Sequence, residues 1–340
     1  MSSLYDELTQ QPQALRELVA FYRGQGAALL RQAVSPLPPL LTGMGASYHA
    51  AWIAALHFNC YSIPARSMEA VDLLNYATSR ILQTSTVIYI SQSGTSGEVP
   101  PLLDLLSKDA ALLAVTNNPR SLLSRRARLT LPELGGVETL VASKTYLNTL
   151  ALLWLLVRRW SGVWSGNEFS QIEEVIQRLE EILAGAQSTA ARLVETFDRL
   201  DTLLFLGHGP HAATARQAAM MMSEWSKVPA LSCGIGAFRH GFIETVQPGM
   251  GVVVFSSPTR TGASAQALAG ELADLGATVL LIENGCLRGW GETCPTLDGV
   301  DEFLSPILDI VPVQFFTEAL ARHRNLPPGF RYIGKVVQQL

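Results

Sequence analysis

Short apolar runs that end in glycine- or serine-containing turns recur along the chain and are each followed by a helical pattern. Pro39 to Leu56 begins with such a run and passes through Gly43-Met44-Gly45-Ala46-Ser47. Thr86 to Ile90 is followed by Ser91-Gln92-Ser93-Gly94-Thr95-Ser96-Gly97, and Leu112 to Asn118 gives the next strand with its turn. Continuous apolar strands that alternate with helices are typical of a parallel sheet covered on both faces.

The same pattern occurs a second time, at an offset of about 165 residues. Thr202 to Met220 repeats the first strand, turn and helix, with Gly207-His208-Gly209-Pro210 as its turn. Gly251 to Leu275 repeats the second, and Val279 to Gly285 repeats the third. The sequence therefore predicts two duplicated, doubly wound α/β domains with parallel sheets, whose ligands bind at the carboxyl ends of the strands.

Three helical segments lie outside this repeat. Phe169 to Phe197 carries Ile172, Val175, Ile176 and Leu179 at helical spacing between glutamates, which predicts a long amphipathic linker helix. Leu4 to Leu30 predicts another amphipathic helix, with Leu15, Leu18, Val19 and Tyr22 on one face. Leu150 to Val157 is too short to span a bilayer and predicts a buried core helix.

These patterns divide the 340 residues into five segments. We expect an N-terminal helical leader (1–30), a first domain (31–165), a linker helix (166–198), a second domain (199–325) and a C-terminal tail (326–340).

Composition and charge narrow the function. Only 16% of the residues are charged and the net charge is −4, so no broad basic face for nucleic acid is expected. The first residues carry no secretory signal, which favours a cytoplasmic protein. Cys60, Cys233, Cys286 and Cys294 have no metal-ligand spacing, so we expect buried or half-buried free thiols and no metal site.

The serine-rich turn after Ile90 offers hydroxyls and free backbone N–H groups at the start of a helix, which suits a phosphate dianion. An ordinary capped Ser/Gly turn is the alternative. Gly207-His208-Gly209-Pro210-His211-Ala212 also fits a dinucleotide fingerprint. Glu224, the only acid near 20 positions on, lies in a helical stretch, and Pro210 removes a donor, so no nicotinamide cofactor is expected.

Three residues are candidates for acid–base or nucleophilic chemistry. Glu224 ends an apolar helix beside Trp225, where burial would raise its pKa. His240 precedes a glycine and titrates in the working range, and Lys335 of the tail could form a Schiff base with a ketose. A surface glutamate, a hydrogen-bonded loop histidine and a solvated tail lysine are the alternatives.

Several stretches together resemble the sugar isomerase (SIS) domain family, especially the isomerase half of glucosamine-6-phosphate synthases. They are Gly43 to His49, Ser91 to Gly94, Gly136 to Thr145, Phe238-Arg239-His240-Gly241 and the tail around Lys335. The resemblance implies two tandem, flavodoxin-like, three-layer αβα SIS domains joined by a long helix.

The resemblance also implies roles for individual residues. It implies Glu224 as the proton shuttle, His240 as the ring-opening residue and Lys335 as the Schiff-base lysine. It implies a set of substrate contacts on the first repeat: Ser47, Ser91, Gln92, Ser93 and Ser96 for the phosphate, with Val141 and Ser143 near the sugar. Ser256-Ser257-Pro258-Thr259 is interpreted as a degenerate copy, which leaves one site per chain.

Two departures from the sequence pattern of the synthases leave the identity of the substrate open. Met220-Met221-Met222-Ser223 replaces a lysine-rich stretch of the synthases, and Phe242 replaces a proline after His240-Gly241. With no N-terminal nucleophilic cysteine or glutaminase domain ahead of the first repeat, we expect an aminosugar 6-phosphate isomerase or deaminase without glutaminase activity. A fructosamine (Amadori) 6-phosphate deglycase and a non-catalytic sugar-phosphate sensor are the alternatives, and the family suggests a homodimer.

Overall fold

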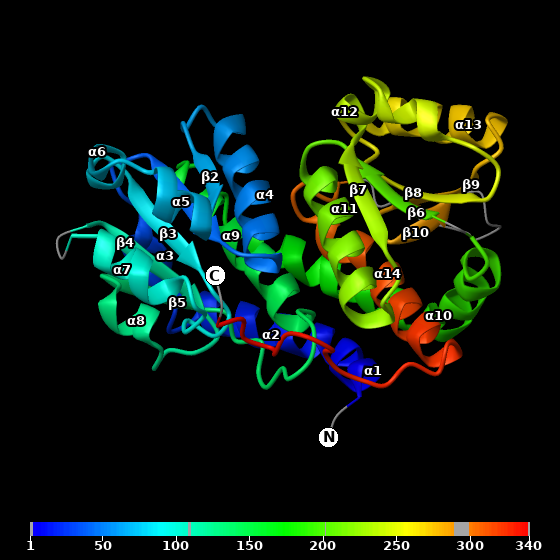
Figure 1. Ribbon diagram of the computed structural model, residues 1–340. Helices are drawn as coiled ribbons and strands as arrows, with labels where there is room; N and C mark the ends of the chain where they lie inside the picture. The colour runs from blue at the N-terminus through cyan, green and yellow to red at the C-terminus, as the bar shows by residue number, and fades with distance from the viewer. Residues whose placement is uncertain (1–2, 108–109, 201, 289–298, 339–340) are drawn as a thin grey trace. The chain divides into compact units, whose positions relative to one another are not determined.

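The computed structural model describes residues 3–107, 110–200, 202–288 and 299–338, and it divides into two units. The first unit comprises residues 10–173 and 330–340, and the second comprises residues 1–9 and 174–329. Each unit contains one sheet with helices on both faces, so the chain has two tandem α/β domains (Figure 1). The C-terminal tail therefore belongs structurally with the first sheet, although it follows the second in sequence.

The sheet of the first unit is entirely parallel and has the order β2-β1-β3-β4-β5. Its strands are β1 (Pro39–Gly43), β2 (Arg66–Glu69), β3 (Thr86–Ile90), β4 (Leu112–Thr116) and β5 (Leu129–Pro132). The central strands β1, β3 and β4 are buried along their whole length, which explains why they read as continuous apolar runs in the sequence.

Helices cover both faces of this sheet. On one face, Leu40, Val87, Tyr89 and Ala114 form a core with buried residues of α5, α7 and α8. On the other face α4 packs on β1 and α9. The helices of the unit are α2 (Gln11–Arg23), α3 (Ala27–Ala33), α4 (Ala46–Cys60), α5 (Ala70–Tyr76), α6 (Ser79–Gln83), α7 (Val99–Leu105), α8 (Leu122–Arg126) and α9 (Lys144–Trp160).

The sheet of the second unit has the order β10-β9-β8-β6-β7. Its strands are β6 (Thr202–Gly207), β7 (Ala230–Gly234), β8 (Met250–Ser256), β9 (Thr278–Glu283) and β10 (Cys286–Arg288). The edge strand β10 runs antiparallel to β9, in contrast to the wholly parallel sheet expected. Asn284 and Gly285 both have positive φ, at 51° and 75°, and make the tight hairpin that turns the chain back.

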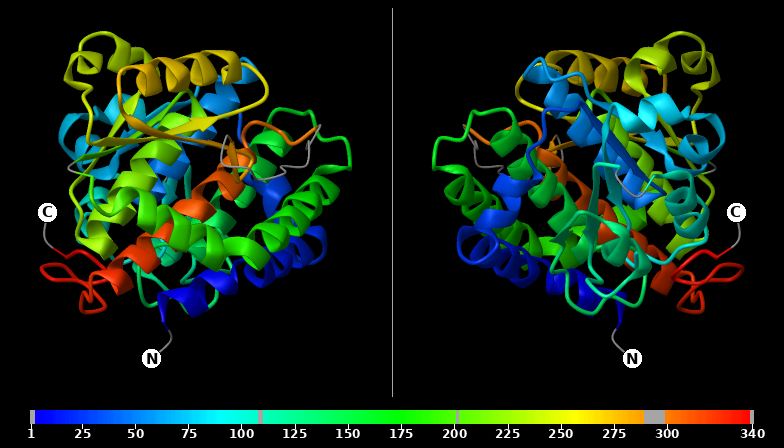
Figure 2. Two further views of the ribbon diagram at one scale, coloured as in Figure 1. Left: turned by 90° about the vertical axis from the view of Figure 1, so that its right-hand side faces the viewer. Right: turned by 90° about the vertical axis from the view of Figure 1, so that its left-hand side faces the viewer.

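Helix α13 covers one face of this second sheet, while α11 and α14 cover the other (Figure 2). Even-numbered residues of β6 and β8, such as Leu204 and Val254, face α12 and α13 in one core. The elements of the unit are α1 (Leu4–Thr9), α11 (Pro210–Met221), the π-helix η1 (Met222–Ser226), α12 (Ile235–Arg239), the 3-10 helix η2 (Phe242–Thr245), α13 (Gly262–Asp274) and α14 (Ser305–His323).

The duplication is visible in backbone geometry as well as in strand order. Gly45, before α4, has φ 51° and ψ −125°, and Gly209, before α11, has φ 50° and ψ −123°. Few residues other than glycine adopt such a conformation without strain. Both repeats thus use the same glycine turn to pass from their first strand to their first helix.

Two of the helices predicted outside the repeat are confirmed and one is not. Helix α10 (Glu168–Phe197) matches the predicted linker, and Leu150 to Val157 is buried within α9. The leader is not one helix but α1, α2 and α3, because the chain breaks at Gln10 and again around Gly24 and Gly26. Residues on the predicted apolar face, such as Leu15 and Tyr22, are nevertheless fully buried.

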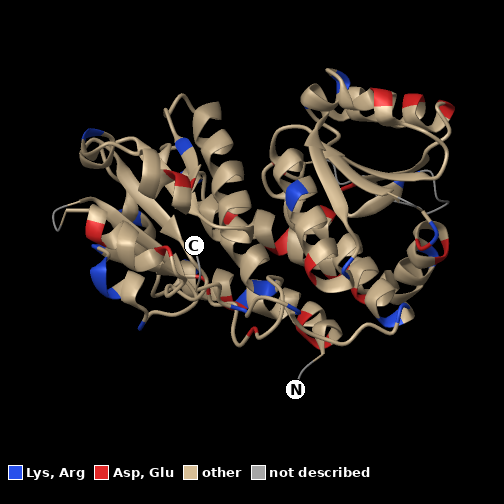
Figure 3. Ribbon diagram, in the orientation of Figure 1, with Lys and Arg blue, Asp and Glu red and all other residues tan. Residues whose placement is uncertain are grey.

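The charged residues and the cysteines contribute little to the architecture of the two units. Lysines and arginines are scattered over the helices of each unit (Figure 3). Cys60, Cys233 and Cys286 are free thiols, but Cys60 is exposed rather than buried or half-buried, and Cys294 lies outside the described residues. None of the described helices is both long and apolar enough to cross a membrane.

Candidate active site

The candidate phosphate loop lies where the first sheet reverses its strand order. Strand β1 pairs with β2 on one side and β3 on the other, so the strand order reverses at β1, and ligands of such sheets bind at the carboxyl ends of the strands at this point. A Cβ at Gly43 would come within 2.7 Å of the Ile90 carbonyl and 2.8 Å of Ser47 Cβ. The glycine therefore lets the first turn of α4, with Ser47, pack close to the ends of β1 and β3.

Hydrogen bonds within the serine loop hold its turn in place. The Gly94 N–H donates to the carbonyl of Ser91 at 3.1 Å and to its hydroxyl at 3.2 Å, and the Thr95 N–H donates to Ser93 Oγ at 3.2 Å. Gly94 has φ +62°, and a Cβ there would clash with Ser121. Ser91 is buried, while Gln92, Ser93 and Ser96 are half-buried. The loop is preformed, and most of its predicted binding residues reach solvent.

A buried acid anchors the far end of this loop. Ser96 Oγ donates to Glu98 Oε1 at 2.5 Å and lies 3.5 Å from Ser91 Oγ. Burial raises the pKa of Tyr89, and the nearby Glu98 adds to that rise. In this arrangement the Ser96 hydroxyl donates to Glu98, so it can donate to a phosphate only after rotating away from that carboxylate.

The loop before α9 presents the residues expected near the sugar. Val141 is 1% exposed and Ser143 is fully buried. The Ser143 backbone N–H and hydroxyl both donate to Glu138 Oε1, at 2.9 and 3.1 Å. Both donors of Ser143 are therefore engaged by Glu138, which leaves only lone pairs on its hydroxyl oxygen.

The C-terminal tail brings Lys335 into this same unit. Lys335 Nζ donates to Glu138 Oε2 at 3.0 Å, and the two side chains are 22% and 0% exposed. The Gly97 N–H donates to the Val337 carbonyl at 2.9 Å, and Gln338 Nε2 donates to the Thr95 carbonyl at 3.3 Å. The tail is thus bonded both to the end of the serine loop and to the loop before α9, and it holds Lys335 beside the predicted phosphate and sugar contacts.

Two acids beside this lysine form a pair that the sequence predictions left without a role. Burial raises the pKa of Glu133 to about 8, and the neighbouring Glu138 adds to the rise. Burial also acts to raise the pKa of Glu138, but Lys335 and the donors of Thr145 and Ser143 outweigh it and lower that pKa. At neutral pH the geometry therefore favours a charged Glu138 and a protonated Glu133. An acid directly after an apolar strand was the available sequence signal for Glu133.

Glu224 lies in the second unit, within the π-helical turn η1 that follows α11. Single π-helical turns are rare and occur frequently at functional sites. Ser226 Oγ donates to the Met222 carbonyl at 2.6 Å, and Lys227 Nζ donates to the Glu224 carbonyl. Glu224 is half-buried, and its sequence neighbours Met222 and Trp225 are buried.

His240 follows α12 in the second unit and is exposed. Its imidazole has no hydrogen-bonding partner among the described residues, and Gly241 after it has φ +144°. Glu244 follows in η2 and is exposed as well. His240 is therefore free to meet a ligand, and the glycine gives its loop a turn that other residues rarely make.

The repeat of the serine loop in the second unit differs from the first in sequence and in hydrogen bonding. Pro258 and Thr259 occupy the places of Ser93 and Gly94. The Ser256 hydroxyl donates to the buried Glu283 at 3.2 Å, and the other oxygen of Glu283 is paired with Arg288 at 2.7 Å. These differences support the interpretation of this loop as a degenerate copy.

The predicted site residues therefore fall into two groups. The first unit brings together the serine loop, Ser47, the Val141–Ser143 loop and Lys335. Glu224 and His240 both belong to the second unit. Within the described part of the chain, no cluster of three His, Cys, Asp or Glu side chains has the geometry of a metal site.

Comparison with known proteins identifies relatives along the whole chain. The glutamine–fructose-6-phosphate aminotransferase (isomerizing) of Thermococcus kodakarensis is 26% identical over 332 residues, which cover 95% of this chain and 55% of the relative. The chain spans about half the length of the curated relatives it matches.

Solved structures share the fold at low sequence identity. The C-terminal domain of glucosamine-fructose-6-phosphate aminotransferase from Francisella tularensis aligns with a TM-score of 0.79 at 20% identity, covering 97% of this chain and 99% of that one. Glucosamine-6-phosphate deaminase from Thermotoga maritima aligns with a TM-score of 0.78 at 21% identity, covering 99% of both chains.

The family model for the SIS domain matches twice, over residues 40–159 and 198–315. The two matches contain the two sheets described above, including the glycine turns at Gly45 and Gly209. The chain belongs to the SIS domain family and contains two tandem copies of that domain.

Proposed function

We propose that the chain binds a phosphorylated sugar at the serine loop of the first unit and acts as an isomerase or deaminase on an aminosugar 6-phosphate. The observation that carries the proposal is the docking of the Lys335 tail on the same unit as the serine loop. A phosphate loop with a lysine held beside it suits a ligand with an anion at one end and a carbonyl or amine at the other.

The phosphate would sit at the carboxyl ends of β1 and β3. Ser47, Ser91, Gln92, Ser93 and Ser96 would donate to its oxygens, together with backbone N–H groups of the loop. Val141 and Ser143 would line the sugar. None of these contacts requires a metal, because hydroxyl and N–H donors alone can satisfy phosphate oxygens.

Chemistry on C1 and C2 would use the three acid–base candidates. His240 would protonate the ring oxygen to open the sugar, and Glu224 would carry the proton between C1 and C2. With a 2-amino sugar, water replaces the released ammonia and a ketose 6-phosphate is formed. The proposal assigns no glutamine hydrolysis to these two domains.

The name of the Thermotoga maritima structure supports this direction, since it is a glucosamine-6-phosphate deaminase with the same fold over the whole chain. The test is to incubate the purified protein with glucosamine 6-phosphate and to measure ammonia and fructose 6-phosphate. Fructose 6-phosphate with glutamine is the parallel arm and is expected to stay inactive. Lack of turnover of any amino-hexose phosphate would refute the proposal.

A fructosamine 6-phosphate deglycase is the second candidate, favoured by one contact. The Lys335 amine donates to the buried Glu138 carboxylate, which suits a charged lysine better than a nucleophile. A deglycase needs no Schiff base and would tolerate Lys335→Met, while releasing free amino acid from a 6-phosphofructosyl amino acid. Tight binding of a sugar phosphate without exchange of the C2 proton in deuterated water would instead favour a sensor.

A homodimer is part of the proposal, because His240 is exposed and has no hydrogen-bonding partner among the described residues, which suits a histidine that contributes to the site of a neighbouring subunit. Mixing His240→Ala chains with Lys335→Met chains tests this. If each site combines residues of two chains, the mixed dimers regain activity that neither parent has. If activity stays at the parental level, each chain supplies its own histidine.

A further inference from the structure

Glu138 is shielded from solvent. It accepts more hydrogen bonds than any of the residues expected from the sequence to contact the phosphate or the sugar. Its Oε1 accepts from Ser143 N, Ser143 Oγ and Thr145 N at 2.9 to 3.1 Å. Its Oε2 accepts from Thr145 Oγ1 at 2.6 Å and from Lys335 Nζ at 3.0 Å. Five donors thus converge on one carboxylate whose side chain is 0% exposed.

These donors come from two segments that are far apart in the sequence. Ser143 and Thr145 flank the start of α9, where a carboxylate is also favoured by the positive helix end. Lys335 lies 197 residues away, on the tail. The carboxylate therefore joins the loop expected near the sugar to the lysine expected near the reacting carbons.

We propose that Glu138 is a positioning residue, which fixes Lys335 and the Ser143 hydroxyl relative to each other. Because its oxygens are occupied by donors from Ser143, Thr145 and Lys335, it acts through these neighbours. By accepting the hydrogen bond of the Ser143 hydroxyl, it fixes the direction of that O–H and leaves the lone pairs of the oxygen as acceptors. By accepting a hydrogen bond from Lys335, it fixes the position of the amine relative to the serine loop.

The other charged groups nearby do not replace it. Lys144 Nζ is occupied by Gln10 Oε1 at 2.6 Å and the Val137 carbonyl at 2.7 Å. Glu133 is buried nearby, but no hydrogen bond joins it to Lys335 in the described structure, and its Oε2 has no partner. Glu138 is therefore the carboxylate that pairs with the tail lysine.

A purely structural role is the competing explanation, since Ser143 N and Thr145 N are donors that any helix start must satisfy. Glu138→Gln separates the two roles, because its amide oxygen still accepts from these donors while the charge facing Lys335 is lost. Glu138→Asp keeps the charge on a shorter side chain. Glu133→Gln is the matched control, because it removes a neighbouring buried acid that makes no bond to Lys335.

The first readout is the reactivity of Lys335, and it requires no substrate. The chain has four lysines, so acetylation by a limiting amine-reactive ester can be followed at each one by peptide mass spectrometry. We expect acetylation of Lys335 to rise about fivefold in Glu138→Gln, as loss of a partly shielded ion pair predicts, and less in Glu138→Asp. Lys227, held by the Gly329 carbonyl, is the internal reference and should not change.

The second readout is kinetic and rests on the proposed function. Glu138→Gln should lower kcat more than it raises KM, and in a Lys335→Met background it should have no further effect. Equal acetylation of Lys335 in the wild type and Glu138→Gln would overturn the proposal, as would additive kinetic effects in the double variant. If the wild type turns over no aminosugar phosphate, the proposed function fails while the acetylation readout still decides the role of Glu138.

Discussion

Replacing Gly97 with alanine should release the C-terminal tail from the serine loop. A Cβ at this position would lie 2.3 Å from the carbonyl oxygen of Gln338 and 2.7 Å from its carbonyl carbon. Because both atoms belong to the backbone, a side-chain rotation cannot relieve the clash. The tail has to recede by roughly an ångström to reach ordinary contact distance.

Such a displacement breaks the bonds that hold the tail. The Gly97–Val337 bond of 2.9 Å and the Gln338–Thr95 bond of 3.3 Å would both be stretched out of range. Each bond contributes about 0.5 to 1.5 kcal/mol. Their loss lowers the ratio of docked to free tail by a factor of about 5 to 100, since about 1.4 kcal/mol corresponds to tenfold.

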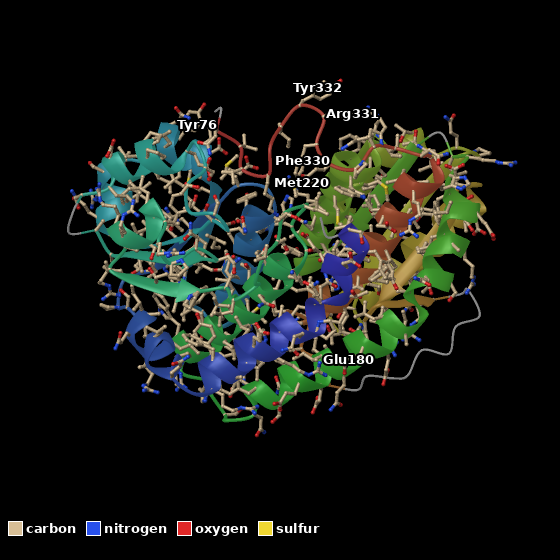
Figure 4. All side chains as sticks on the ribbon, turned by 90° about the horizontal axis from the view of Figure 1, so that it is seen from below. Tyr76, Glu180, Met220, Phe330, Arg331 and Tyr332 are labelled. Atoms are coloured by element: carbon tan, nitrogen blue, oxygen red, sulfur yellow. The ribbon has the colours of Figure 1, made fainter. Side chains whose placement is uncertain are left out.

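Limited proteolysis measures this ratio directly. Trypsin cleaves after Lys335 only when the tail is free, so the cleavage rate should rise by about the same factor of 5 to 100. Cleavage after the exposed Arg120, which lies outside the tail, is the internal reference. Arg331, labelled with Phe330 and Tyr332 in Figure 4, lies on the tail, so its cleavage reports tail release as well. Gly185→Ala is the control substitution, because a Cβ at Gly185 in α10 meets nothing within 4 Å. An unchanged cleavage rate and unchanged kcat/KM in Gly97→Ala would refute the reasoning.

Three further outcomes are expected. Ser93→Ala should raise the KM for a sugar phosphate about tenfold or more, because a hydrogen bond to a charged group usually contributes that much. Ser257→Ala in the second repeat should leave KM unchanged. Equal effects of the two substitutions in steady-state kinetics would contradict the assignment of one phosphate loop. Glu224→Gln should lower kcat by about 10²- to 10⁴-fold and abolish C2 proton exchange into deuterated water while sugar-phosphate binding persists, and retained exchange would exclude Glu224 as the proton carrier. The pKa of Glu133 is raised from 4.5 to about 8, so between these pH values the folded state holds a proton that the unfolded state has lost, and stability falls as pH rises. Glu133→Gln should remove this fall of at most about 1.4 kcal/mol per pH unit, and urea denaturation curves with the same pH dependence in both proteins would show that Glu133 is not the titrating group.

The sequence predicted the repeated architecture well because its signals are local. Fully buried strands such as β1 and β3 must be apolar throughout, and the turn after each needs glycine, so both features can be read within a few residues. The serine loop was predictable for the same reason. The family resemblance, rather than periodicity, pointed to Val141 and Ser143.

Other features depended on distant contacts or on overlooked breaks. No local pattern shows that Lys335 pairs with Glu138 or that Glu133 lies buried beside them, since these contacts form only after folding. The breaks in the leader at Gly24 and Gly26 and the Asn284-Gly285 hairpin did carry local signals. In the leader, the helical spacing of apolar residues favoured one continuous helix. At Asn284-Gly285, the similarity to the first repeat favoured a parallel sheet.

The tail contacts also bear on the order in which the protein becomes functional as it folds. Gln338 and Thr95 are 243 residues apart in sequence, whereas β1 and β3 pair across fewer than 50 residues. Contacts between distant residues pay a larger loop-closure cost and form late unless the chain between them has already condensed. A refolding chain would therefore complete its first sheet before Lys335 arrives, and recovery of secondary structure would precede recovery of activity.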